Sequence, residues 1–252
     1  MDIKDILSTP QRVSNVNYLI STLKDAGITN DYMIAGILGV VGKESNFKPQ
    51  SEISYRNTSA ERIRSIFSVF QNMTDAEINA IKVNDVQFFN MIYGGKFGNA
   101  ANEGYKYRGR GYNQLTFKSN YASIGNRIGR DLVNDPDMVN NGRVAAEVLV
   151  DYFVREFSKY PQKVAEVVGS SNPNDVQSLE SATELAAWAN SGWKSRSGSV
   201  VRNAVQYATP YAQVLYPYVK SRFFLPSREL ILAAAAIALV IAGIIISVNY
   251  LR

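Results

Sequence analysis

Apolar residues recur along most of the chain at intervals of three and four, the spacing that places them on one face of an α-helix. Ile34, Ile37, Leu38 and Val41 follow this spacing, whereas the apolar–polar alternation typical of β-strands is scarce. The pattern predicts a mainly α domain with helices at Gln11–Asp25, Asp31–Glu44, Ala60–Phe70, Asp75–Ile92 with a possible break, Lys118–Ile128, Gly142–Phe157, Leu179–Asn190 and Gly198–Tyr216.

Two segments that lack this periodicity are predicted to be loops. Tyr93–Tyr112 and Ser170–Asp175 are rich in Gly, Asn and, in the first case, aromatic residues. Because loops of this composition on a helical scaffold often carry function, both are candidates for a functional site.

The segment Leu230–Val248 has no charged residue and no polar face. A helix over this range is roughly 29 Å long, close to the thickness of a bilayer's hydrocarbon core. A buried core helix is the alternative, but a soluble domain could not easily cover all sides of such a helix. The pattern therefore predicts a transmembrane helix, and the basic residues before it (Lys220, Arg222 and Arg228) predict that the preceding domain starts on the cytoplasmic face.

The predicted organisation is a domain over residues 1–222, a short juxtamembrane linker over 223–229 and the transmembrane helix over 230–248. The N-terminal stretch MDIKDILSTPQRVSN has no apolar core of the length that a secretory signal peptide requires, so we expect no signal peptide. The protein is expected to be a single-pass membrane protein with a C-terminal anchor.

Composition restricts the chemistry. The 252 residues include no Cys and no His, which excludes disulfides, Ser-His-Asp and Cys-His catalysis and His-ligated zinc sites. Carboxylates are therefore the expected proton carriers of any hydrolytic reaction at neutral pH, and neither a metal nor a cofactor is expected. The formal net charge of +5 favours an anionic partner without choosing among nucleic acid, a cell-wall polymer and a membrane surface.

Two glutamates are the candidate proton carriers. Glu44 ends an apolar helix, and Glu52 follows after a loop that contains Pro49. Inverting glycosidases use two carboxyl groups about 6.5–9.5 Å apart, one as acid and one as base, and this spacing permits such a pair. Both could instead be ordinary surface acids. A phosphate-binding loop at GVVGKES is excluded because Ile37 occupies the position of its first glycine.

The segment Tyr105–Tyr121, YKYRGRGYNQLTFKSNY, carries a family resemblance. Its pattern GRGxxQLTxxxNY resembles the signature of the family 19 glycoside hydrolases, which comprise chitinases and related phage endolysins. Glu-Ser-x-Phe followed by Ser-Glu resembles their catalytic segment, and the stretches Asp131–Val139 and Asn190–Gly192 are further matches. The resemblance implies a lysozyme-like helical domain with long loops around a cleft.

The resemblance also implies roles for individual residues. Glu44 would be the general acid, Glu52 the general base, and Thr116 would help to hold the attacking water. The residues that would bind sugar, line the cleft or order the site are Tyr107, Tyr112, Gln114, Asn120, Asn190 and Arg202.

The chain departs from the family pattern next to the acid. Relatives usually carry His there, whereas this chain has Lys43, whose charge would favour an ionised Glu44. We expect the Lys43 side chain to point away. Arg108 and Arg110 could contact nucleic acid, contact substrate or pair with carboxylates lining the cleft, and the family signature favours the last two interpretations over the first.

These observations predict a membrane-anchored muralytic glycosidase that hydrolyses the β-1,4 bonds of peptidoglycan by an inverting two-carboxylate mechanism. Its expected partners are peptidoglycan glycan strands and, through Leu230–Val248, a lipid bilayer, and no nucleic acid is expected. The pattern favours a bacteriophage protein in a virion membrane or the host cell membrane. The alternatives are a chitinase, a lytic transglycosylase, which needs one catalytic carboxyl, and a non-catalytic wall-binding protein of the virion membrane.

Overall fold

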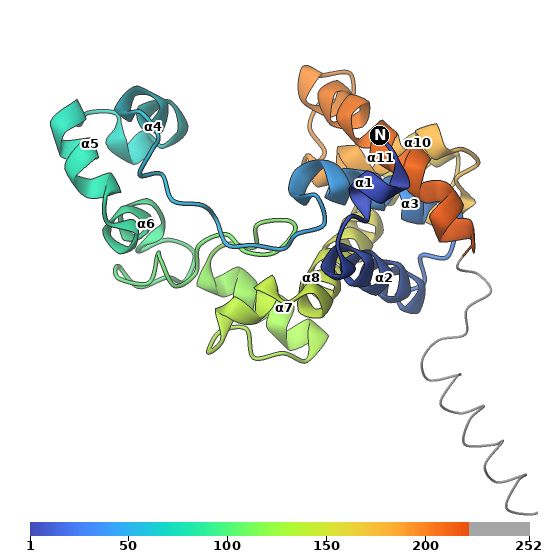
Figure 1. The fold of residues 1–252 in the computed structure, drawn as a ribbon, viewed down its shortest axis with the longest axis horizontal. Helices are drawn as coiled ribbons and strands as arrows, with labels where there is room; N and C mark the ends of the chain where they lie inside the picture. The colour runs from blue at the N-terminus through green and yellow to red at the C-terminus, as the bar shows by residue number, and fades with distance from the viewer. Residues whose placement is uncertain (222–252) are drawn as a thin grey trace, which may run out of the picture.

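The computed structural model describes residues 1–221, which form a helical structure without a β-strand (Figure 1). The mainly α prediction is confirmed for these residues. The α-helices are α1 (Ile3–Ile6), α2 (Pro10–Asp25), α3 (Asp31–Ser45), α4 (Ala60–Ile66), α5 (Asp75–Lys82), α6 (Asp85–Tyr93), α7 (Lys118–Ile128), α8 (Gly142–Lys159), α9 (Pro161–Val168), α10 (Leu179–Asn190) and α11 (Ser199–Ser221). Three 3₁₀ turns lie between them, η1 (Ser68–Phe70), η2 (Pro136–Asn140) and η3 (Pro173–Asp175).

The predicted break within Asp75–Ile92 is confirmed. α5 ends at Lys82 and α6 begins at Asp85, because the Asn84 side chain accepts a hydrogen bond from the Gln87 N–H and so caps a new helix. The predicted helix Ala60–Phe70 is wrong in its second half, where α4 ends at Ile66 and a 3₁₀ turn follows.

Helix α3 lies at the centre of the main body and packs against α10 and α11. Glycines on one face allow this close approach: a Cβ atom at Gly36 would lie 2.6 Å from the carbonyl carbon of Ala182 in α10. At Gly39, a Cβ atom would lie 2.8 Å from the carbonyl oxygen of Ala208 in α11. Since α3 is buried along most of its length, the position of its C-terminal turn, which carries Glu44, is firmly set by packing.

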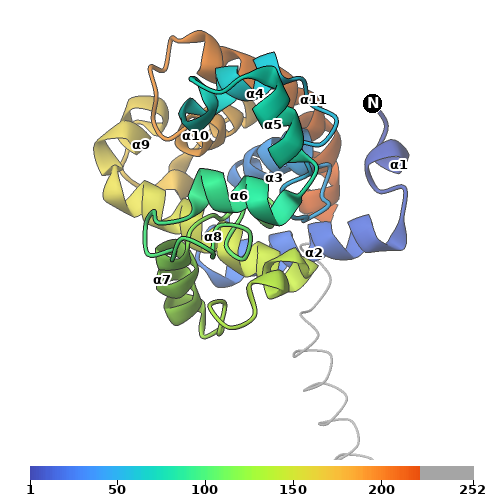
Figure 2. The same ribbon diagram turned by 90° about the vertical axis from the view of Figure 1, so that its left-hand side faces the viewer.

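Helices α4, α5 and α6 form a small lobe that stands apart from the body built by α2, α3, α8, α10 and α11 (Figure 1). The lobe has its own core of mostly aromatic and aliphatic side chains, including Phe70, Phe88 and Phe89. Figure 2 views the molecule from the side of this lobe. The segments before α4 and after α6 connect it to the body, and both contribute to the site described below.

The predicted linker and transmembrane helix, 223–229 and Leu230–Val248, lie outside the described residues. No helix within residues 1–221 has the length and apolar character needed to cross a bilayer.

Candidate active site

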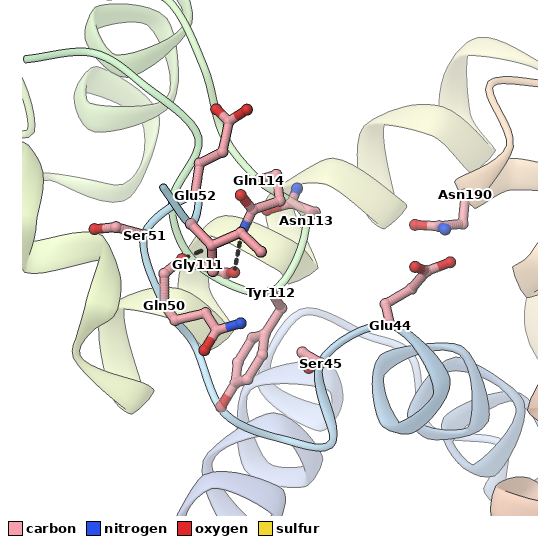
Figure 3. Close-up of a pocket in the computed structure, with 11 residues that line it drawn as sticks. Glu44, Ser45, Gln50, Ser51, Glu52, Gly111, Tyr112, Asn113, Gln114 and Asn190 are labelled. Atoms are coloured by element: carbon pink, nitrogen blue, oxygen red, sulfur yellow. Dashed lines mark hydrogen bonds between the residues drawn. The ribbon is translucent and has the colours of Figure 1, made fainter. Parts of the chain in front are cut away.

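A cleft of about 370 Å³ lies where the end of α3, the segment after it, the 111–114 loop and the end of α10 meet (Figure 3). It brings together Glu44, Glu52, Tyr112, Gln114 and Asn190, all of which were predicted site residues. The other lining residues are Ser45, Gln50, Ser51, Ile53, Gly111 and Asn113.

The wall that carries Glu52 is formed by backbone pairing between two segments distant in sequence. The Glu52 N–H donates to the Gly109 carbonyl at 2.7 Å, and the Gly111 N–H donates to the Gln50 carbonyl at 3.1 Å. Gln114 adds a side-chain bond from Nε2 to the same Gln50 carbonyl at 3.1 Å. A Cβ atom at Gly109 would lie 2.6 Å from Gln114 Oε1, so a larger residue here would require the Gln114 side chain to shift.

Glu44 lies in the last turn of α3, and its carboxylate points towards Asn190 at the end of α10 (Figure 3). Its side chain is 39% exposed and forms an ion pair with Lys43, whose Nζ lies 2.6 Å from Oε1. The expectation that Lys43 points away is therefore wrong. The two side chains are adjacent on the exposed end of the helix, where nothing separates them.

Glu52 is half-buried and faces the small lobe. The Tyr93 hydroxyl, at the end of α6, donates to the carboxylate with 3.0 Å to each oxygen. The Tyr55 hydroxyl lies 3.2 Å from Oε1, and the Gly109 N–H donates to Oε2 at 3.3 Å. Three donors from two segments thus converge on one carboxylate.

Burial and hydrogen bonding act on the Glu52 carboxyl in opposite directions. Burial raises its pKa above the ordinary value, while the hydrogen bonds from Tyr93, Gly109 and Tyr55 oppose that rise. Burial and the neighbouring Glu52 carboxylate raise the pKa of Tyr55 to about 12 and raise the pKa of Tyr93 as well. Both phenols therefore stay protonated near neutral pH and remain donors to Glu52.

Of the two tyrosines predicted to line the cleft, only Tyr112 does so. Tyr112 lines it and is 4% exposed, and its hydroxyl has no hydrogen-bond partner among residues 1–221. Tyr107 is fully buried beneath α7, and its hydroxyl donates to the Val133 carbonyl at 3.0 Å. The expected cleft position of Tyr107 is therefore wrong, because the ring is part of the core.

Thr116 and Asn120 lie beside the cleft. The Thr116 hydroxyl donates to the Gln114 carbonyl at 2.8 Å, and Asn120 Nδ2 donates to the Thr116 carbonyl at 2.8 Å. Both residues line a second depression, which adjoins the cleft at Gln114. The structure thus places Thr116 in the neighbouring depression and not among the residues that line the cleft of the two glutamates.

Arg202 is not near the acid pair. It lies at the start of α11 and lines a separate depression together with Glu184 and Arg196. Its Nη1 donates to the Ser197 carbonyl, which holds it at the turn before the helix.

Arg110 has a structural role. Its side chain is 2% exposed, forms an ion pair with Asp137 at 2.7 Å and donates to the Tyr121 hydroxyl at 3.1 Å. Arg108 donates to the Tyr105 carbonyl at 2.8 Å, with its guanidinium 4.0 Å from the centre of that ring. Neither arginine lines the cleft.

Tyr55 and Tyr93 contact Glu52 directly, although no motif of the sequence marks them as site residues. Tyr93 is 41 positions away from Glu52, and only the folding of the small lobe brings them together. Within residues 1–221, no group of three or more acidic side chains could hold a metal ion.

Comparison with known proteins supports a class for this chain. Residues 94–188 match the family model of the chitinase class I glycoside hydrolases, family 19. This segment contains the GRGxxQLT element but begins after Glu44 and Glu52. The matches therefore support a family 19 glycoside hydrolase domain, whereas the roles of the two glutamates stay predictions.

Individual relatives also match only a short part of this chain. The chain is 38% identical to endochitinase CH25 of Brassica napus over 74 residues, which is 29% of this chain and 23% of the relative. It is 37% identical to a glycosyl hydrolase family 19 domain-containing protein of Haemophilus influenzae over 67 residues, 25% of this chain and 33% of the relative. The chain thus matches a third or less of the length of these relatives.

Proposed function

We propose that this protein is a muralytic glycosidase that hydrolyses the β-1,4 bonds of peptidoglycan with inversion, using Glu44 as general acid and Glu52 as general base. The observation that carries the proposal is that these glutamates, from different segments, line one cleft. The absence of His and Cys from the sequence leaves carboxyl groups as the natural proton carriers.

The surroundings of Glu52 suit a base. Three hydrogen-bond donors favour the ionised carboxylate, which can then take a proton from water. Glu44 stands at the more exposed side of the cleft beside Asn190, where it can reach a leaving-group oxygen. For Glu44 to donate a proton, its carboxyl must be protonated and released from Lys43 when substrate binds.

Product analysis tests this proposal. The full chain is incubated with purified peptidoglycan, and the soluble fragments are analysed by mass spectrometry and by the anomeric configuration of the new reducing ends. Fragments with reducing ends of inverted configuration are expected. Anhydro-ring products would instead identify a lytic transglycosylase, and binding without any fragments would identify a non-catalytic wall-binding protein.

Two variants assign the roles. Glu44→Gln should fold and bind the wall but lose turnover, because the leaving group then lacks its proton donor. Glu52→Gln should also lose most activity. Near-normal rates in Glu52→Gln would contradict the two-carboxylate mechanism.

Chitin is the second candidate substrate, and the names of the plant relatives favour it. Chitin and peptidoglycan share β-1,4-linked N-acetylated sugars, so the same carboxyl pair would serve both. Parallel digestion of chitohexaose and peptidoglycan under one set of conditions decides between them by the ratio of kcat/KM.

Our proposal also includes a lipid bilayer as partner, in a bacteriophage virion membrane or the host cell membrane, reached through Leu230–Val248. The apolar character of that segment supports it. Deletion of residues 230–252 should release the protein from the membrane fraction, and membrane association that survives the deletion would refute the anchor. Detection of the protein in purified virions would favour the virion membrane, and its absence from them the host membrane.

A further inference from the structure

The second depression, with a volume of about 300 Å³, continues the cleft along the body of the molecule. Asn113 and Gln114 line both, so a chain-like ligand held at Glu44 and Glu52 has a direct path into it. Its remaining lining residues come from the 115–117 segment, α7 and α8: Leu115, Thr116, Phe117, Asn120, Ser123, Ile124, Tyr152 and Arg155.

Arg155, on α8, is the charged residue among those that line the depression. Within residues 1–221, none of the lining residues carries a carboxylate. Its side chain is 45% exposed. The nearest carboxylates are Asp151 at 4.0 Å and Glu156 at 3.9 Å, both at the outer limit of an ion pair. Among residues 1–221, the guanidinium at the depression therefore makes no ion pair shorter than 3.9 Å.

Both neighbouring carboxylates have shorter bonds to other groups. Arg127 contacts Asp151 through two nitrogens, Nε at 2.7 Å and Nη2 at 2.8 Å. Glu156 accepts a hydrogen bond from the Trp193 indole at 2.7 Å. Arg127 compensates the charge of Asp151, and the neutral Trp193 indole occupies one oxygen of Glu156. Arg155 keeps only its two long contacts, so its planar fork can form a shorter bidentate bond to an incoming carboxylate.

We propose that this depression binds an acidic substituent of the glycan strand, with Arg155 pairing with its carboxylate. The inference rests on the proposed function and names its substrate class, a glycan that carries carboxylates, such as peptidoglycan, in preference to neutral chitin. Thr116 and Asn120 contribute hydroxyl and amide groups beside Arg155, which suit the sugar ring that carries the substituent.

Binding to cell-wall sacculi tests the proposal separately from catalysis. Co-sedimentation of the full chain carrying Glu44→Gln measures the Kd for native sacculi and for sacculi whose carboxylates have been converted to amides. Binding should be tighter to native sacculi. Adding Arg155→Gln should weaken binding to native sacculi about fivefold, as expected for a partly exposed ion pair, and leave binding to amidated sacculi unchanged.

Two further variants control for folding and for net charge. Arg155→Lys keeps the cation but not the planar fork, and it should retain only part of the preference. Arg143→Gln removes the same charge from an exposed position of α8 outside the depression, and it should keep the full preference.

Equal binding of the Glu44→Gln chain to native and amidated sacculi would overturn the proposal. The proposal would also be overturned if Arg155→Gln lost the same affinity for native and for amidated sacculi. It would be overturned as well if Arg143→Gln weakened binding to native sacculi as much as Arg155→Gln does. A wild-type chain that releases no fragments from peptidoglycan, yet shows the Arg155-dependent preference in binding, would refute the proposed hydrolysis and leave this binding site standing.

Discussion

Tyr93→Phe removes one hydroxyl from the small lobe and with it the most symmetric contact of the candidate base. That hydroxyl lies 3.0 Å from both oxygens of Glu52. The ring itself packs on Phe89 and Phe117, with centroid distances of 6.1 and 5.4 Å, so phenylalanine retains the packing of tyrosine. The substitution therefore isolates the hydrogen bond.

The expected size of the effect follows from the charge of the Glu52 carboxylate, which accepts the hydrogen bond. A hydrogen bond to a charged group contributes roughly 1.5–3 kcal/mol, and the half-buried position of Tyr93 favours the lower end. About 1.5 kcal/mol lost from the positioning of an ionised base corresponds to about a tenfold lower kcat. Because Tyr93 contacts the carboxylate rather than the substrate, KM should change little.

The pH profile supplies a readout that a purely structural role would not change. A base must be ionised, so activity falls as the pH drops through the pKa of Glu52, which burial already raises. The Tyr93 hydrogen bond lowers that pKa, so its removal should raise the pKa further and move the acidic limb of kcat to higher pH.

Two tyrosines serve as controls for this experiment. Tyr55→Phe removes a single contact of 3.2 Å to one oxygen and should move the limb in the same direction by less. Tyr105→Phe removes a hydroxyl from a ring that packs on Phe89 in the same lobe and should leave the profile unchanged. If the acidic limb of the kcat profile stays in place in Tyr93→Phe, or moves to lower pH, the assignment of Glu52 as a base held by Tyr93 is refuted.

Three other substitutions test the fold and the electrostatics around the site. Gly39→Ala should destabilise the protein by about 1–3 kcal/mol in urea unfolding, because its Cβ would lie 2.8 Å from the Ala208 carbonyl oxygen; an unchanged midpoint would contradict the close approach of α3 and α11. Arg110→Met should cost about 1–3 kcal/mol through the loss of buried hydrogen bonds, while Arg143→Gln on the exposed face stays within about 0.5 kcal/mol. Since the pKa of Glu52 is raised in the folded state, its ionisation lowers stability as pH rises through that pKa, so Glu52→Gln should be at least as stable as the wild type at pH 7. Thermal unfolding midpoints between pH 4 and about 8 check the last prediction, which a markedly less stable variant at pH 7 would contradict.

Helix positions could be predicted where the apolar periodicity is clear. The bounds Lys118–Ile128 and Leu179–Asn190 match the structure at both ends. The last described helix was predicted to end at Tyr216. α11 nevertheless continues to Ser221, where Val219 is buried in the core.

The short helices α1 and α9 were not predicted. α1 has four residues and α9 eight, too few for a clear periodic pattern. α9 also begins at Pro161, directly after the end of α8. The predicted loop Ser170–Asp175 contains a 3₁₀ turn, η3, whose start is capped by the Asn172 side chain.

Part of the candidate site could be predicted because its residues are close in sequence or belong to one motif. Glu44 and Glu52 are separated by a single loop, and Tyr112 and Gln114 belong to the GRGxxQLT element. A motif, however, does not show which of its side chains face the cleft. Tyr107 and Tyr112 are both buried, but Tyr112 lies in the main core cluster where it borders the cleft, whereas Tyr107 belongs to a separate cluster that does not reach it.

The hydrogen bonds to Glu52 come from inside and outside the segment that matches the family model. The segment that matches the family model, residues 94–188, supplies Gly109 and Gln114, which shape the cleft wall. The hydroxyls that hold Glu52 come from Tyr55 and from Tyr93, outside that segment. Because the small lobe carries Tyr93 at the end of α6, a shift of this lobe relative to the body would change the hydrogen bond between Tyr93 and Glu52. We therefore expect substitutions in the small lobe to alter the pH dependence of activity, and substitutions along α8 to alter substrate preference.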